Sequence, residues 1–262
     1  MGLVLFLICL AASSIGAVVG AGGGVIIKPV VDLLGLLPVS TVSFCSGCTV
    51  LCMSVSSLIR TRKSGVRLER KTSSILAVGA AIGGFAGQYI FDYIRAAYQN
   101  DHLLGCIQSV LLLLIMIVIL FYVCKKDRFP SFHIKVLFPT FLIGLFLGMI
   151  SAFLGIGGGP LNVAVLFLFF SMDAKTAAKN SIYIIIFSQL TSIATALATH
   201  SVPEFTWPVL LCMIAGGVGG ALLGAAITKR IDNKGVEKLL KLLILFVIVI
   251  SVYNILKFTV LA

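Results

Sequence analysis

The chain has 262 residues, a formal net charge of +11, 60% hydrophobic residues and only 11% charged residues, whereas soluble domains carry about 25% charged residues. A water-soluble chain this apolar would aggregate through its exposed patches, so the composition excludes an ordinary soluble domain and indicates a protein of the bilayer. The basic residues lie in short loops between apolar runs, which matches the Lys/Arg excess of cytoplasmic loops and argues against a nucleic-acid groove.

The N-terminal segment, at about residues 3–19, resembles a signal peptide in its hydrophobicity. It lacks the positively charged residues that precede the apolar core of a signal peptide, and the apolar run continues beyond that core. We therefore predict that this segment is retained as the first membrane helix.

Ten apolar segments can be drawn along the chain, five in each half. They lie at about 3–19, 25–37, 39–59, 73–94, 103–123, 136–154, 160–171, 174–198, 207–228 and 238–258. In each half the second segment is short and follows a glycine cluster, GAGGG at 20–24 and GIGGG at 155–159. This pattern predicts an all-α polytopic membrane protein with 8–10 membrane helices.

The two glycine clusters are separated by an offset of 135 residues, and other residues share this register. The same offset pairs Thr41 with Thr176, Ser46 with Ser181 and Ser57 with Ser192, and an offset of 136 pairs Gly83-Gly84 with Gly219-Gly220. Internal repeats of this kind are the usual construction of secondary transporters. We therefore predict a first membrane repeat at residues 1–127 and a second at 128–262.

Three loops rich in Lys and Arg define the predicted cytoplasmic side. Their basic residues are Arg60, Arg62, Lys63, Arg67, Arg70 and Lys71 after the third segment, Lys125, Lys126, Arg128 and Lys135 in the central linker, and Lys229, Arg230, Lys234, Lys238 and Lys241 around the start of the last segment. The loop at 200–205 has no Lys or Arg and is predicted to face outside.

The central linker and the loop at 200–205 are predicted to lie on opposite sides of the membrane, so the chain must cross the membrane an odd number of times between them. Three segments lie between them, so the short glycine-led segment counts as a crossing. Five crossings per half make the two halves inverted relative to each other. Arg95 and Lys257 then lie outside, and Lys28 lies within the membrane.

The glycine clusters are the first candidate for a substrate site. Glycine accepts positive φ and allows close approach to the backbone, and a helix that starts after such a cluster directs its positive dipole end and open N–H groups at an anion. The alternative is that the glycines only allow tight helix packing, as small residues do in membranes. The candidate contacts are Gly22, Gly23, Gly24, Gly157, Gly158 and Gly159.

Polar residues near the clusters extend the candidate site. They are Ser43 and Ser46 in the third segment, Asn162 just after the second cluster, and Asn180 and Ser181 in the stretch that corresponds to the third segment. Hydroxyl and amide donors suit an oxyanion. The alternative for a membrane serine is a hydrogen bond to the carbonyl of residue i−4.

Lys28 and Asp32 lie four residues apart, on one face of the second segment. An unpaired charge at the bilayer centre costs about 2.5–3.5 kcal/mol on insertion scales. Two interpretations remain open: the pair only neutralises itself, or Lys28 attracts an anion while Asp32 takes up a coupling proton. The corresponding residues of the second half are Val163 and Phe167, so a charge function is not duplicated.

The seven cysteines lie almost all inside apolar segments, which argues against a secreted disulfide framework. Cys45, Cys48 and Cys52 have helical spacing, but free cysteine is often a small buried hydrophobe, so we predict no metal. The sequence has no HExxH, GxSxG or P-loop pattern. We therefore predict neither an enzyme nor a cofactor.

Three motifs resemble the TauE/SafE sulfite exporter family: GAVVGAGGGVIIKP at 16–29, GMISAFLGIGGGPL at 148–161 and AAKNS at 177–181. The resemblance covers essentially the whole chain. It implies transport of sulfite, of sulfonates such as sulfoacetate or of other small sulfur-containing anions, with contacts near residues 22–24 and 157–159. Cys45 stands where the other half has Asn180, and Lys28 has no counterpart, so a two-fold symmetric site is in doubt.

The repeat and the short, glycine-led segments together favour a secondary transporter that exports a small anion by alternating access, in the plasma membrane. Expected partners are the anion and anionic lipid at the cytoplasmic face, with no nucleic acid. A homo-oligomer stays open. The alternatives from other classes are an intramembrane enzyme and a membrane scaffold without transport activity.

Overall fold

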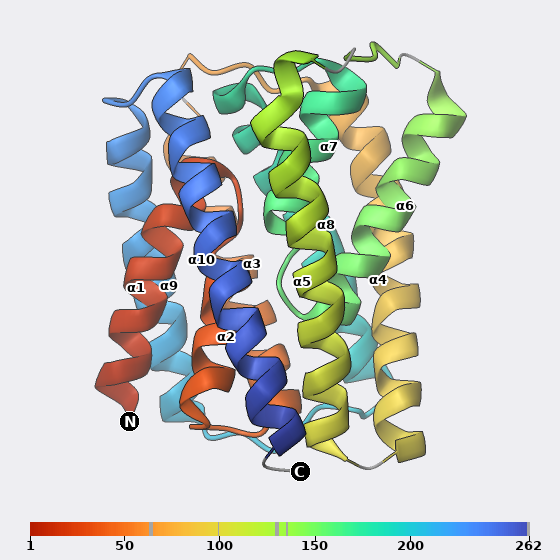
Figure 1. The fold of residues 1–262 in the computed structure, drawn as a ribbon, viewed down its shortest axis with the longest axis vertical. Coiled ribbons are helices and arrows are strands. Elements are labelled where there is room, and N and C mark those ends of the chain that lie inside the picture. Colours follow the sequence, from red (N-terminus) through yellow and green to blue (C-terminus); the bar gives the residue numbers. More distant parts are fainter. Residues whose placement is uncertain (63–64, 99, 129–130, 135, 261–262) are drawn as a thin grey trace.

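The computed structural model describes residues 1–62, 65–98, 100–128, 131–134 and 136–260. Within these ranges all regular structure is helical, and each predicted segment corresponds to one helix (Figure 1). The helices are α1 (Gly2–Val19), α2 (Gly24–Leu34), α3 (Val39–Thr61), α4 (Arg70–Tyr98), α5 (Asp101–Lys125), the 3₁₀ turn η1 (Lys126–Arg128), α6 (Leu137–Leu154), α7 (Gly159–Phe170), α8 (Ala174–Ala198), α9 (Trp207–Thr228) and α10 (Asn233–Val260).

Eight helices in the described part of the chain are long and apolar enough to cross a membrane. The exceptions are α2 with 11 residues and α7 with 12 residues, which at 1.5 Å per residue reach only about 17 Å. The predicted polytopic all-α class is therefore confirmed, and so is the short second helix in each half.

One end of the molecule carries the start of α1, the end of α2 and the loop that was predicted to face outside, and we name it the outer end after that prediction. Thr41, near the start of α3, donates a hydrogen bond to the carbonyl of Glu204 in that loop, at 3.0 Å. Gly2 lies against the thiol of Cys212, early in α9. The N-terminus and the end of α10 lie at this end in Figure 1.

The opposite end carries the basic loops, and we name it the cytoplasmic end after the predicted orientation. Here Lys175, at the start of α8, donates its backbone N–H to the Asn233 side chain at the start of α10, at 3.0 Å. Residue 132, before α6, donates its N–H to the carbonyl of Leu168 near the end of α7. Lys63 and Lys135, which were predicted to be cytoplasmic, lie outside the described residues.

The first glycine cluster reverses the chain inside the molecule. Gly20 lies against Ala178, about one turn into α8, whereas Gly22 lies against Val50 and Ile185, at the middle of α3 and α8. The helix α2 starts at this level and returns to the outer end. As a helix, α2 therefore extends only from the level of the middle of α3 and α8 to the outer end, and the crossing of each short segment stays a prediction.

The second cluster repeats this arrangement from the cytoplasmic end. Gly155 lies against Ser43, four residues into α3, and Gly157 lies against the same Val50 and Ile185 that flank Gly22. Each of these contacts follows from its counterpart in the first half by the offset of 135 residues. Two hairpins, α1–α2 and α6–α7, therefore enter from opposite ends and meet at their glycine turns.

The largest helix contacts recur when the two halves are exchanged. The largest interfaces are α1 with α9 and its counterpart α6 with α4, followed by α4 with α8 and α9 with α3, while α5 packs on its own counterpart α10. Glycines allow the two largest contacts, because an added Cβ would collide with carbonyls of the facing helix. They are Gly79, Gly83 and Gly87 of α4 and Gly216, Gly220 and Gly224 of α9. This packing supports two repeats, whose limits at 1–127 and 128–262 stay a proposal.

Candidate functional site

An open depression of about 600 Å³, the outer vestibule, lies at the outer end. It is formed by the start of α3, the end of α4 and the loop before α9. Its lining residues are Pro38, Ser40, Thr41, Asp92, Arg95, Ala96, Ser201, Pro203 and Glu204. Five of these, Ser40, Asp92, Arg95, Ser201 and Pro203, also line a narrower cavity deeper in the molecule, so they form a neck between the two spaces.

A chain of hydrogen bonds crosses the neck. Arg95 donates to the carbonyl of Ser201 at 3.0 Å, and the Ser201 hydroxyl donates to Asp92 Oδ2 at 2.7 Å. Gln88 Nε2 donates to Asp92 Oδ1 at 3.0 Å, and the Ser192 hydroxyl donates to Gln88 Oε1 at 2.7 Å. The network ties the outer loop to α4 and α8 and holds a carboxylate at the narrowest part of the route.

Below the neck lies the central cavity, of about 20 Å³, which is room for one water molecule. It is lined by α3, α4 and α8 and by Gly155, the first glycine of the second turn. Two hydrogen-bond donors in its wall, Ser43 Oγ and Gln189 Nε2, are buried without a partner. Because buried donors in native proteins nearly always have a partner, these groups indicate a site for a bound acceptor.

The two predicted glycine sets meet at the centre. Gly22, Gly23, Gly157 and Gly158 all have φ between 71° and 81°, a region that L side chains rarely adopt. An added Cβ at Gly24 would lie 2.6 Å from the carbonyl oxygen of Ile156 in the opposite turn. Close packing, the alternative interpretation, is therefore part of their role.

The same turns also form the two helix N-termini. Gly23 and Gly158 are the N-cap residues of α2 and α7, and neither N-terminus has a side-chain cap. Both positive dipole ends are directed into the protein interior at the same depth. This arrangement retains the chemistry that favours an anion nearby.

The predicted polar residues divide between the centre and the cytoplasmic side. Ser43 lines the central cavity. Ser46 Oγ and Asn162 Oδ1, like Ser43 Oγ, are buried without a hydrogen-bond partner, and Asn162 lies against Gly158. The Ser181 hydroxyl donates to the carbonyl of Gly20 at 2.7 Å. Ser181 therefore fixes the first turn, and Ser46, its counterpart in the first half, has no equivalent bond.

Asn180 belongs to a closure of the cytoplasmic end. Its side-chain oxygen accepts from the backbone N–H of Glu69, at 2.9 Å, and from the Ser73 hydroxyl. Lys179 Nζ beside it donates to the carbonyls of Thr61 and Val66, at 3.0 and 2.8 Å. These bonds, which we name the cytoplasmic clamp, tie α8 to the segment between α3 and α4.

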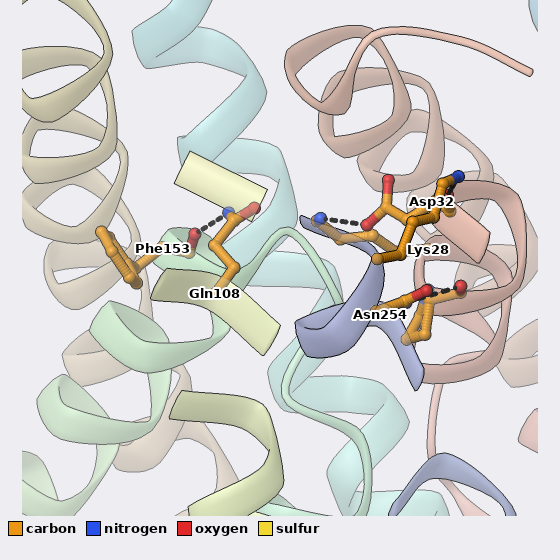
Figure 2. A network of polar contacts seen from close by, with 7 residues as sticks. Lys28, Asp32, Gln108, Phe153 and Asn254 are labelled. Atoms are coloured by element: carbon orange, nitrogen blue, oxygen red, sulfur yellow. Dashed lines mark hydrogen bonds and ion pairs between the residues drawn. The ribbon is translucent and has the colours of Figure 1, made fainter. Parts of the chain in front are cut away.

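Lys28 and Asp32 form an ion pair of 2.7 Å, and both are buried (Figure 2). They belong to α2 and line a small cavity with residues of α5, α10 and the second glycine turn, and none of these residues lines the central cavity. Lys257 Nζ caps α2 from α10 through the carbonyls of Asp32 and Leu33, at 2.8 and 3.0 Å. The structure thus separates this charge pair from the neck and the central cavity.

Cys45, Cys48 and Cys52 are free thiols, buried or half-buried on α3. Within the described ranges, no three His, Cys, Asp or Glu side chains come together in a way that could hold a metal ion. Cys45 belongs to the buried hydrophobic core, and Cys48 packs against that core.

Sequence reasoning missed the residues of the neck and part of the central cavity. Gln88, Asp92 and Arg95 recur at spacings of four and three, so they share one face of α4. That spacing is a signal that could have identified them. Gln189 and Ser201 carry no comparable pattern, because their role depends on contacts between distant parts of the chain.

Comparison with known proteins assigns the chain to a class. The family model described as "Sulfite exporter TauE/SafE" matches residues 5–253. The chain is also 23% identical, over 269 aligned residues, to the "Probable membrane transporter protein YunE" of Bacillus subtilis (strain 168). That alignment covers 93% of this chain and 94% of the relative. No solved structure matches the chain significantly.

Proposed function

Because the chain belongs to the sulfite exporter TauE/SafE family and is a multi-pass membrane transporter, we propose that its substrate is a small sulfur-containing oxyanion or an organosulfonate, such as sulfite or sulfoacetate. Membership in a family of transporters excludes the alternative of an intramembrane enzyme. It also sets aside a scaffold without transport activity.

The observation that carries this proposal is the pair of unpartnered donors in the central cavity. Ser43 and Gln189 offer O–H and N–H groups without a full positive charge. Such donors bind an oxyanion while letting it leave again, which a transport site requires. The N-termini of α2 and α7, which start at the two glycine turns, add an electrostatic potential that favours negative charge.

Alternating access accounts for the unequal ends of the molecule. The outer vestibule leads to the neck and the central cavity, while the cytoplasmic clamp closes the opposite side. Exchange of the two halves would turn this outward-facing arrangement into an inward-facing one. In the exchanged state Ser57, the counterpart of Ser192 at the offset of 135, would line the cytoplasmic route.

The central cavity must widen before it holds such an anion, because it has room for only one water molecule. Release of the neck network around Asp92 would join the cavity to the vestibule. The sequence has no P-loop, so we attribute the driving force to ion gradients and to the gradient of the anion itself. The family description names export, and export requires that the outward gradient of the anion exceeds any opposing gradient of a coupled ion.

Uptake into proteoliposomes tests the proposal. Purified protein would be assayed with labelled sulfite, thiosulfate and sulfoacetate, with taurine and acetate as comparison solutes and protein-free liposomes as the blank. We expect saturable uptake of at least one sulfur-containing anion, with acetate transported at least tenfold more slowly. Uptake no faster than the blank for every anion would contradict the proposal.

A further inference from the structure

A second buried polar cavity, of about 10 Å³, lies between α2, α5 and α10, behind the glycine turns. We name it the cation cavity. Its polar lining residues are Lys28, Asp32, Gln108, Ser109, Ser251 and Asn254, all of which are buried. So many buried polar groups at membrane depth are costly and usually functional.

The amide groups of this cavity are fixed so that oxygen atoms remain available. Gln108 Nε2 donates to the carbonyl of Phe153 at 2.7 Å, and Asn254 Nδ2 donates to the carbonyl of Pro29 at 2.9 Å. Gln108 Oε1, Asn254 Oδ1 and Ser251 Oγ are then buried without a partner. Figure 2 shows the Lys28 side chain directed toward Gln108. The unpartnered groups are oxygens, which are the ligands of hard cations and the acceptors of a protonated group.

The cation cavity adjoins an open pocket at the outer end. Asp32 lines both this cavity and an open pocket of about 300 Å³ at the outer end. The groups in that pocket that carry or take up charge are Asp32, His102 of α5 and Lys257 of α10. Asp32 therefore lies between the cation cavity and a pocket that is open at the outer end, and it lines neither the outer vestibule nor the central cavity.

The cavity is also in direct contact with the glycine turns. Ile156, in the second turn, lines the cavity, and its carbonyl lies against Gly24 of the first turn. Gln108 holds the carbonyl of Phe153, just before the second turn, and Lys28 follows Gly24 by one helical turn. Because only the backbone of the second turn separates the cavity from the first turn at this point, a charge in the cavity interacts electrostatically with an anion at the turns.

We propose that this cavity binds the coupling cation of the transporter, a proton or Na⁺, at Asp32 and the neighbouring amide oxygens. The Lys28–Asp32 pair is neutral as it stands, so a cation bound at Asp32 leaves one buried positive charge uncompensated. An anion near the glycine turns offsets that charge. Each ion therefore favours binding of the other, and the two cross together. The inference rests on the proposed function, since it needs an anion at the turns.

The test compares two readouts in the same proteoliposomes, with sulfoacetate as the probe. Pyranine inside the liposomes reports proton entry, and ²²Na⁺ uptake reports sodium entry, each after addition of sulfoacetate. Exchange of labelled for unlabelled sulfoacetate, without any gradient, reports anion binding and movement alone. We expect sulfoacetate to evoke entry of one of the two cations in the wild-type protein.

The variant Asp32→Asn should lower sulfoacetate-evoked cation entry at least tenfold while exchange continues at a measurable rate. Because a lone buried Lys28 could impair folding, K28M/D32N removes both charges and should show the same loss of coupling. The matched control Glu237→Gln breaks the other ion pair of the described residues, with Lys126 at the cytoplasmic end, and should keep wild-type coupling.

Unchanged cation entry in Asp32→Asn or in K28M/D32N would overturn the proposal that this cavity binds the coupling cation. Exchange without entry of either cation in the wild-type protein would overturn it as well. Absence of exchange in the wild-type protein, with sulfite and thiosulfate as further probes, would instead contradict the proposed function itself.

Discussion

Individual donors determine what the central cavity can bind. Ser43 and Gln189 lie on α3 and α8, at the two sides of the same space, and neither has a partner in the protein. A hydrogen bond to a charged group is worth about 1.5–3 kcal/mol. Most of the substrate affinity on the outer side is therefore expected to depend on these two side chains.

Removal of these donors should weaken substrate binding. For Ser43→Ala and Gln189→Leu we expect the KM of sulfur-anion uptake to rise about 10- to 100-fold, which corresponds to one lost charged hydrogen bond. The control Ser188→Ala removes a neighbouring buried hydroxyl that donates to the carbonyl of Ile185 and does not line the cavity. Uptake kinetics of the three variants measure the effect, and equal KM values in all of them would refute the site.

The conformation of the glycine turns should be indispensable. Gly157 has a φ of 77°, and a Cβ there would lie 2.8 Å from a methyl of Val50. We expect Gly157→Ala to lower the melting temperature in detergent by on the order of 5 °C, since strain of this kind costs about 1–3 kcal/mol. Gly219→Ala, where the nearest atom is a Leu10 methyl at 3.4 Å, should melt within about 1 °C of wild type. A G157A protein as stable as G219A would contradict the account.

Whole elements were predictable from the sequence to different degrees. The ten helices and the short second helix of each half follow from hydropathy and the glycine clusters, because bilayer solvent forces apolar segments into helices. The offset of 135 also anticipates equivalent surroundings, as the contacts of Gly22 and Gly157 with the same Val50 and Ile185 demonstrate. Hydropathy and the glycine clusters were therefore enough to predict the helices, because the membrane environment determines them.

The contacts that form the neck and the clamp were not predictable, because they join elements far apart in the chain, even though the neck residues of α4 share one helix face. Asn180 was selected as a substrate contact from its symmetric position. In the structure its oxygen accepts hydrogen bonds from Glu69 and Ser73, and a contact of Asn180 with the substrate stays a prediction. Periodicity identifies a helix face but not the partner of that face, so α4 was overlooked as a wall of the outer route.

The clamp should control the cytoplasmic opening. For Asn180→Ala we expect a severalfold increase in maleimide labelling of a Ser57→Cys reporter, because Ser57 is fully buried behind the closed end and the variant frees the segment that α8 holds. The reporter is placed in a protein whose seven native cysteines are replaced, and labelling is done in inside-out vesicles. Asn233→Ala, which removes a different contact at the same end, should leave labelling unchanged. Equal labelling in both variants would show that the clamp does not close this side.

The whole molecule combines two inverted hairpins with two unequal ends. Glycine-mediated contacts join α1 of the first half to α9 of the second half, and α4 of the first half to α6 of the second half. Movement of one half against the other would therefore alter both ends at once. This coupling of the ends is the physical basis for alternating access.

The most direct test of this account is labelling from both sides in the presence and absence of substrate. Cysteine reporters at Ser192, which lines the central cavity on the outer route, and at its counterpart Ser57 would be labelled with an impermeant maleimide in right-side-out and inside-out vesicles. We expect the transported anion to lower labelling of S192C from outside and to raise labelling of S57C from inside, each at least twofold. Two results would contradict alternating access between the inverted halves. Either the anion changes the labelling of neither reporter, or it raises the labelling of both.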